Sequence, residues 1–165
     1  MKITAILTAC MVLFSHSFLV KGEIPFEAIP VEERAVMADM SLDDFIFISS
    51  VVEAESNRSN DGDLTGRIYI CLVILNRVND SRFPNTIGSV LTAPGQFSTV
   101  RNGRSVVSRT DYSDQAVIEA VAMLETGEVP NVLFFNCRGF NYGTPFRLYE
   151  DSDTIGGNYF MTLEG

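Results

Sequence analysis

The sequence predicts one α+β domain that is mainly helical and carries a small antiparallel β element. A long apolar run, flanked by two segments with apolar residues at helical spacing, predicts three main helices at residues 41–55, 64–78 and 113–126. Strand-like runs are few and short, and they gather around residues 97–107 and in the last third of the chain. The 165 residues, of which 46% are hydrophobic and 20% charged, suit a single globular core.

The first 22 residues predict a secretory signal peptide. Lys2 supplies a basic start, residues 3–20 are mostly apolar and contain no acid, and Gly22 is a small residue at the expected cleavage point. Two alternatives stay open. About 18 moderately apolar residues approach the length of a membrane anchor, and Cys10 ends a short lipoprotein-like motif. Residues 23–40 then form an N-terminal arm or linker, with a helix expected at 31–40.

The first main helix is predicted to begin after Ser41. A serine followed three residues later by an acid, here Asp44, is a capping pattern ahead of an apolar run. Leu42, Phe45 and Val52 recur at helical spacing and are expected to face the core.

The second helix, residues 64–78, is apolar on almost every side, which predicts a central, buried position. Its β-branched residues would also suit a strand, but its length favours a helix. Cys71 lies within it and is expected to behave as a small buried hydrophobe. Pairing of Cys71 with Cys137 is an alternative, because an exported chain meets an oxidising compartment.

The rest of the chain is predicted from breakers and turn signals. Pro84 precedes a short helix at 86–91, and a turn at 101–104 predicts a hairpin between 97–100 and 105–107. Gly127 and Pro130 end the third helix. Two strands are expected beyond it, with a glycine-rich surface loop between them; the three segments are 132–136, 158–162 and 138–157.

The charge balance excludes several classes of function. Without the leader, the chain has lost both lysines and its one histidine, His16, and holds 10 Arg against 21 acidic residues, a net charge of −11. Binding to nucleic acid through phosphates, or capture by an anionic surface, is disfavoured at this charge. Without histidine no Ser-His-Asp, Cys-His or His-ligated zinc site can form. Acid–base chemistry then depends mainly on carboxylates.

Several short motifs follow one another along the chain in a characteristic order. Glu53-Ala54 ends the first helix, and Gly66 and Val73-Ile74-Leu75-Asn76-Arg77 lie on the second. Later motifs are Gln96-Phe97-Ser98, Phe134-Phe135-Asn136 and Gly156-Gly157-Asn158-Tyr159-Phe160. This order resembles the catalytic domain of the SleB/CwlJ-type cell wall hydrolases, the spore-cortex-lytic family, from Ser41 to Phe160. The resemblance implies a lysozyme-like, lytic-transglycosylase-like fold for residues 41–165.

The resemblance also implies that the protein is a peptidoglycan-lytic glycosidase with Glu53 as its catalytic residue. Such an acid must be protonated near neutral pH, and aromatic walls such as Phe97 and Phe134 would favour the protonated form by desolvation. Glu55 points about 200° away from Glu53 on the helix, so the two cannot form a close pair. From the segment alone, Glu53 could equally be an exposed helix end.

A single carboxylate favours lytic transglycosylation between N-acetylmuramic acid and N-acetylglucosamine. A two-carboxylate hydrolase is the alternative, although the other acids considered are expected to cap helices or lie in loops: Asp61, Asp63, Asp111 and Asp114. A phage endolysin of the same fold, or a non-catalytic peptidoglycan-binding protein, are further alternatives.

The resemblance implies glycan contacts for Gln96, Phe97, Ser98, Asn136, Tyr159, Asn76 and Arg77. Asn76 and Arg77 could instead bond the last helical carbonyls, and Phe97 could belong to the core. Peptidoglycan glycan strands are the expected partner, with no cofactor, metal or nucleic acid and no evident protein partner. The chain is expected to be exported to the cell wall or periplasm. It departs from the family in having no Trp and a longer loop between Glu53 and Gly66.

Overall fold

The computed structural model describes residues 24–56, 63–127 and 129–163. The chain divides into two compact units, Met1–Pro30 and Val31–Gly165. The described part of the first unit contains a short 3-10 helix, η1, at Phe26–Ala28. The predicted signal peptide and Asp61 lie outside the described residues. The proposed division of the chain at residues 22 and 40 stays a prediction.

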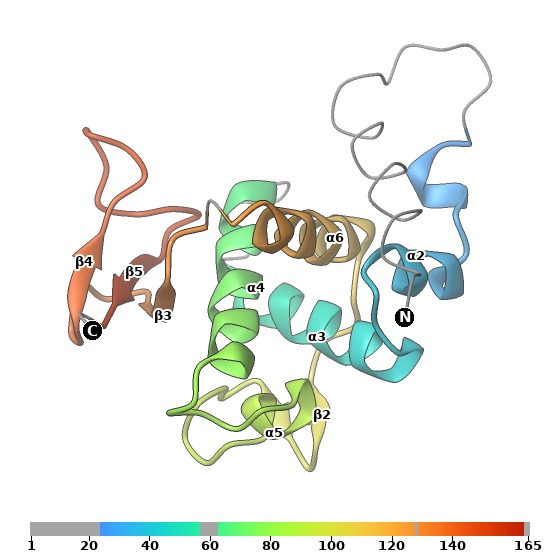
Figure 1. Cartoon of the computed structure of the whole chain (residues 1–165), viewed down its shortest axis with the longest axis horizontal. Helices are drawn as coiled ribbons and strands as arrows, with labels where there is room; N and C mark the ends of the chain where they lie inside the picture. Colours follow the sequence, from blue (N-terminus) through green and yellow to red (C-terminus); the bar gives the residue numbers. More distant parts are fainter. Residues whose placement is uncertain (1–23, 57–62, 128, 164–165) are drawn as a thin grey trace. The chain divides into compact units, whose positions relative to one another are not determined.

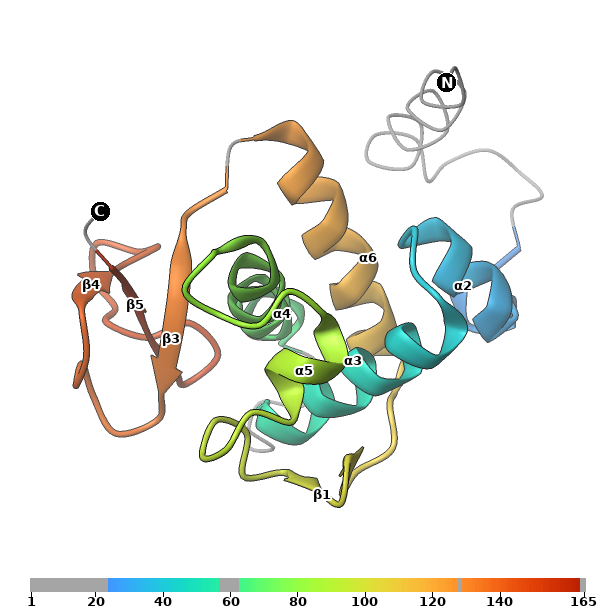
Figure 2. The same ribbon diagram turned by 60° about the horizontal axis from the view of Figure 1, so that its bottom comes forward.

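The second unit is built around one central helix. Its helices are α2 (Val31–Met37), α3 (Leu42–Glu55), α4 (Leu64–Asn79), α5 (Ile87–Leu91) and α6 (Asp111–Thr126) (Figure 1). Figure 2 views α4 almost end on, with α3, α5, α6 and the strand β3 arranged around it. Side chains of α4 are buried from Gly66 to Leu75, which confirms the predicted central helix.

Local capping explains where the long helices begin. Ser41 accepts a hydrogen bond from the backbone N–H of Asp44 at 3.2 Å, as its capping pattern predicts. Asp63 caps α4 in the same way, because its side chain accepts a hydrogen bond from the backbone N–H of Gly66 at 3.0 Å. Thr110 forms a capping box with Ser113. Helix α6 therefore begins two residues earlier than the predicted start at residue 113.

The described strands form two small antiparallel sheets. The hairpin pairs β1 (Val100–Arg101) with β2 (Arg104–Ser105) through a turn in which Asn102 and Gly103 have φ values of 52° and 73°. Two positive φ values suit the type I′ turn of a two-residue hairpin. The second sheet has the order β3-β5-β4, from β3 (Val132–Asn136), β4 (Thr144–Phe146) and β5 (Tyr159–Thr162).

Strand β4 corrects the prediction that residues 138–157 form only a loop. The strand is short and contains Pro145, so it lacks a strand signal of its own. Its position comes from pairing with β5 and from Phe146, whose ring stacks on that of Tyr69 at a centroid distance of 5.6 Å. Pro145 is tolerated because β4 is an edge strand.

The C-terminal end of α4 covers β3, the other edge strand of the three-stranded sheet. Asn76 donates from Nδ2 to the carbonyls of Pro130 and Val132 at 3.1 and 3.0 Å, and Arg77 donates from Nε to the carbonyl of Leu133 at 2.7 Å. These carbonyls belong to β3 and the segment before it, and β5 occupies the opposite side of β3. The two side chains therefore satisfy an edge that would otherwise be open to pairing.

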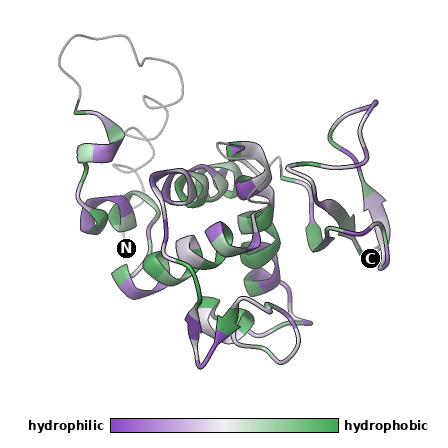
Figure 3. Cartoon of the chain, turned by 180° about the vertical axis from the view of Figure 1, so that it is seen from behind, coloured by the Kyte–Doolittle hydropathy of each residue, from purple (hydrophilic) through white to green (hydrophobic). Residues whose placement is uncertain are grey.

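The core contains residues from α3, α4, α6 and the second sheet, including Phe45, Ile70, Ala116 and Phe160. Hydrophobic residues, green in Figure 3, gather on the central helices. Cys71 is buried and Cys137 exposed, and both are free thiols, which favours the small-hydrophobe interpretation of Cys71. No helix among the described residues is long and apolar enough to span a bilayer.

Candidate active site

Glu53 lies where three helices meet. It occupies the last turn of α3, and its side chain is 14% exposed. Arg67 of α4 donates from Nε to Oε2 at 3.0 Å and from Nη2 to Oε1 at 2.9 Å. Thr110, the residue that caps α6, donates from Oγ1 to Oε2 at 2.7 Å. Glu53 is therefore held in a defined orientation and is not an exposed helix end.

Arg67 is almost completely buried, with a side chain 4% exposed. Its third nitrogen, Nη1, donates to the carbonyl of Asp63 at 3.1 Å, and its guanidinium carbon lies 5.9 Å from the ring centroid of Tyr112. A bidentate arginine fixes the plane of a carboxylate. It also favours the ionised carboxylate over the protonated acid.

Thr110 directs its hydroxyl proton towards Glu53 because of its role as a cap. The Thr110 oxygen accepts a hydrogen bond from the backbone N–H of Ser113 at 3.2 Å. A hydroxyl has one proton to donate, and Glu53 Oε2 at 2.7 Å is a much nearer acceptor than Ser113 Oγ at 3.5 Å. Thr110 and its neighbour Tyr112 are both exposed, so the carboxylate lies near a surface that a ligand can reach.

The start of α6 is fixed in turn by ion pairs. Arg34 of α2 contacts Asp111 at 2.6 Å and Asp114 at 2.7 Å, and Arg109 also pairs with Asp114. Burial raises the pKa of the fully enclosed Asp114, and the hydrogen bond from Arg34 and the charge of Arg109 offset part of this effect. These contacts hold the helix end that presents Thr110 to Glu53.

The loop before β5 approaches the same end of α4. A Cβ atom added at Gly66 would lie 2.8 Å from the Cα of Gly156 and 3.1 Å from a carboxylate oxygen of Asp63. Side chains other than hydrogen do not fit at this distance, so both backbones depend on glycine here. The C-terminal sheet region and the N-terminal end of α4 are thereby packed together one residue before Arg67.

A second cluster surrounds Arg77, one of the predicted glycan-contacting residues. The guanidinium of Arg77 lies between three aromatic rings at 5.2 to 5.6 Å, those of Phe83, Phe97 and Phe134. Its Nη1 donates to Gln96 Oε1 at 3.1 Å. Burial lowers the pKa of Arg77 to about 10. Phe97 is itself buried, at 5% exposed, so it belongs to the core.

The predicted site residues therefore fall into two groups. Arg67 and Arg77 are ten residues apart on one helix, which corresponds to about 15 Å along its axis. The expectation that Phe97 and Phe134 would form aromatic walls around Glu53 is wrong, because both rings pack against Arg77. Arg67 and Thr110 were not anticipated from the sequence. A lone charge in the apolar run 64–75 was the one available signal for Arg67.

Of the remaining predicted residues, two are exposed and two are half-buried. Gln96 and Ser98 are exposed on the loop after α5. Asn136 and Tyr159 are paired neighbours on β3 and β5, where Asn136 Oδ1 accepts from the N–H of Arg138 at 2.7 Å and the ring of Tyr159 lies 5.0 Å from that of Phe140.

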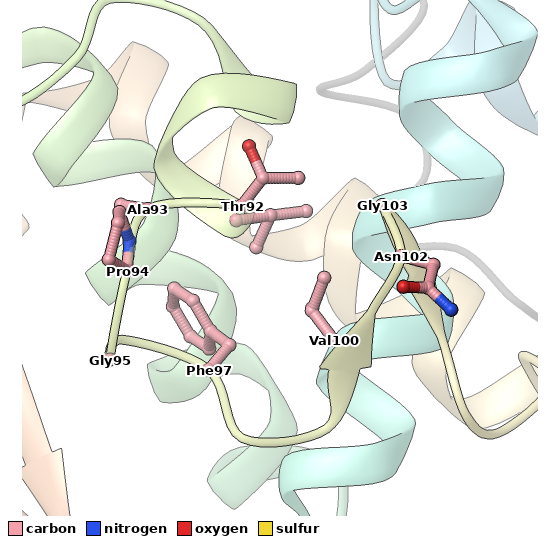
Figure 4. Close-up of a pocket in the computed structure, with 9 residues that line it drawn as sticks. Thr92, Ala93, Pro94, Gly95, Phe97, Val100, Asn102 and Gly103 are labelled. Carbon is pink, nitrogen blue, oxygen red and sulfur yellow. The ribbon is translucent and has the colours of Figure 1, made fainter.

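A surface pocket adjoins Phe97 but not Glu53. It is formed by the segment from Leu91 to Gly103, and Figure 4 shows Thr92, Phe97 and Val100 around its interior. Glu55 lies towards this side of the molecule, since it accepts a hydrogen bond from Thr99 at 2.6 Å. The opposite orientation of Glu53 and Glu55 agrees with the helical geometry. Among the described residues no cluster of acids, cysteines or histidines has a geometry that could hold a metal ion.

The fold resembles that of a solved cell wall hydrolase domain. The crystal structure of the catalytic domain of the Bacillus cereus SleB protein matches this chain with a TM-score of 0.56 at 26% identity, over 74% of this chain and 91% of that one. This match confirms the predicted α+β class. The family model described as Cell Wall Hydrolase matches residues 62–161, and the chain belongs to that family. Glu53 precedes the matched residues.

Curated relatives agree with this assignment. The spore cortex-lytic enzyme of Bacillus cereus is 30% identical over 74 residues, which are 45% of this chain and 29% of that enzyme. The spore cortex-lytic enzyme of Oceanobacillus iheyensis is 34% identical over 56 residues, which are 34% of this chain and 20% of that enzyme. The similarity therefore spans less than a third of these relatives' length.

Proposed function

We propose that this domain cleaves the glycan strand of peptidoglycan between N-acetylmuramic acid and N-acetylglucosamine, with Glu53 as the acid and base. The observation that carries the proposal is the fixed carboxylate of Glu53, bound by Arg67 and Thr110 close to a reachable surface. Membership of the Cell Wall Hydrolase family and similarity to spore cortex-lytic enzymes support the choice of substrate.

Lytic transglycosylation is the favoured route because it needs one carboxylate. Glu53 gives its proton to the glycosidic oxygen as the bond to C1 of the muramic acid breaks. The 6-hydroxyl of the same sugar then attacks C1 and returns its proton to Glu53, which leaves a 1,6-anhydro ring.

Nearby acids are engaged elsewhere, which supports the single-carboxylate route over a two-carboxylate hydrolase. Glu55 accepts from Thr99, Asp63 caps α4, and Asp111 and Asp114 pair with Arg34. A hydrolase of this kind would place a second carboxylate within about 10 Å of the first with room for a water or a sugar carbon between them.

We propose that the glycan contacts the exposed residues Gln96 and Ser98 and the half-buried residues Asn136 and Tyr159. Asn76, Arg77 and Phe97 would contribute by holding this surface, since their contacts are to β3 and to the loop that carries Gln96. Export through a signal peptide at residues 1–22 would bring the domain to its substrate, and N-terminal sequencing of the exported protein tests the cleavage point.

The test is lysis of purified peptidoglycan followed by turbidity, with the wild type compared with Glu53→Gln. Loss of lysis with retained binding to peptidoglycan is the expected result, and Glu55→Gln is the matched control that should keep activity. Mass spectrometry of the released muropeptides distinguishes the routes, because the anhydro product is lighter by one water. Binding without lysis by the wild type would instead indicate a non-catalytic peptidoglycan-binding protein.

A further inference from the structure

We propose that Arg67 is a positioning residue that sets the pH range of the reaction by holding Glu53 in its ionised form. This inference rests on the proposed function of Glu53.

The geometry of the pair supports a strong effect. The two side chains are 4% and 14% exposed, so solvent screens their charges poorly. Two parallel hydrogen bonds, at 3.0 and 2.9 Å, join the guanidinium to both carboxylate oxygens. The positive charge of the guanidinium therefore faces both carboxylate oxygens of Glu53 directly.

The other charged groups near this site are largely engaged with partners of their own. Asp63, on the same side as Arg67, binds the N–H of Gly66. At the start of α6, Asp111 and Asp114 are matched by Arg34 and Arg109. On α3 itself, Glu55 is bonded to Thr99. Thr110 adds a neutral donor to Glu53, which favours the carboxylate in the same direction as Arg67.

The two halves of the proposed reaction need opposite forms of Glu53. Bond cleavage begins with the protonated acid, and attack by the 6-hydroxyl needs the carboxylate as base. Arg67 stabilises the carboxylate and so reduces the fraction of protein that can begin a turnover at neutral pH. The rate should therefore fall as the pH rises through the point at which Glu53 loses its proton, and Arg67 moves that point to lower pH.

The experiment compares the pH dependence of peptidoglycan lysis by the wild type, Arg67→Met and Arg67→Lys, between about pH 4 and pH 9. In Arg67→Met the pH at which activity is half lost should move upwards by about 1 to 3 units. Arg67→Lys keeps the charge but lacks the planar fork. Its half-loss point should stay near that of the wild type while its maximal rate falls.

Controls separate this inference from the proposed function. Thermal unfolding shows whether each variant is folded, and Arg67→Gln replaces Arg67→Met if the latter does not fold. An unmoved half-loss point in a folded, uncharged variant overturns the role of Arg67, as does an equal upward movement in Arg67→Lys. Glu53→Gln tests the proposed function alone. If it lyses peptidoglycan as fast as the wild type, Glu53 is not the catalytic residue, whatever the Arg67 variants do.

Discussion

Gly66 and Gly156 meet backbone to backbone, and a Cβ atom on Gly156 would lie only 2.7 Å from the Cα of Gly66. Gly66 lies in the first turn of α4 and Gly156 in the loop that leads to β5, so this contact joins the C-terminal sheet region to the start of α4, one residue before Arg67. Such closeness is possible because neither residue has a side chain.

Gly66→Ala should therefore destabilise the protein by about 1 to 3 kcal/mol, since the new methyl group overlaps backbone that cannot turn away. Urea unfolding measures the effect. Gly88→Ala in α5 is the matched control, because nothing lies within 4 Å of its added Cβ. Equal stability of the Gly66 variant and the wild type would show that the loop can retreat from α4.

Thr110→Val should lower both stability and lytic activity, whereas Thr110→Ser should change neither greatly. Valine keeps the branched shape but removes the hydroxyl that caps α6 and donates to Glu53. Loss of a threonine cap costs about 1 kcal/mol. Unfolding curves and lysis rates are the measurements. A Val variant with a wild-type rate would show that the Thr110 hydroxyl does not orient Glu53.

Arg77→Met should cost about 1 to 3 kcal/mol, because it leaves the buried carbonyl of Leu133 without its donor. Arg101→Met is the comparison, since Arg101 is exposed on β1 and a change there should stay within about 0.5 kcal/mol. Denaturant unfolding with both variants checks this. Similar midpoints for the two would indicate that Arg77 contributes little to holding α4 against β3.

The cysteines should differ sharply in reactivity. Burial raises the pKa of the Cys71 thiol. At a pH of about 9 this thiol should therefore stay protonated and unreactive. Cys137, which is exposed, should react with iodoacetamide in the native protein. Peptide mapping by mass spectrometry locates the label. A Cys71–Cys137 disulfide in the non-reduced protein, or rapid native labelling of Cys71, would contradict the structure.

Elements with strong local signals were predictable. Ser41 and Asp44 mark the start of α3, the apolar run gives α4 to within a residue at its C-terminal end, and the strand at 132–136 has its predicted bounds. Strand β4 could not be predicted, because Thr144-Pro145-Phe146 owes its conformation to pairing with β5.

The candidate site was predictable only in part, because its contacts, like the pairing of β4 with β5, join residues that are far apart in the chain. Glu53 stands out through its position in a motif. Its partners Arg67 and Thr110 lie 14 and 57 residues away along the chain, and hydrogen bonds at such separations depend on how helices pack. Asn76 and Arg77 were recognisable as polar residues ending a buried helix. That they would cover the edge of β3 requires knowing where the sheet lies.

The ion pairs of Arg34 bear on how the protein can be shortened. A version starting at the predicted boundary, residue 41, would lack α2 and with it one of the two arginines that neutralise the fully enclosed Asp114. A shortened version of the protein that keeps the folded unit should therefore start before Val31. A form trimmed at residue 41 would bury the carboxylate of Asp114 with less of its charge neutralised, in the first turn of the helix that Thr110 caps.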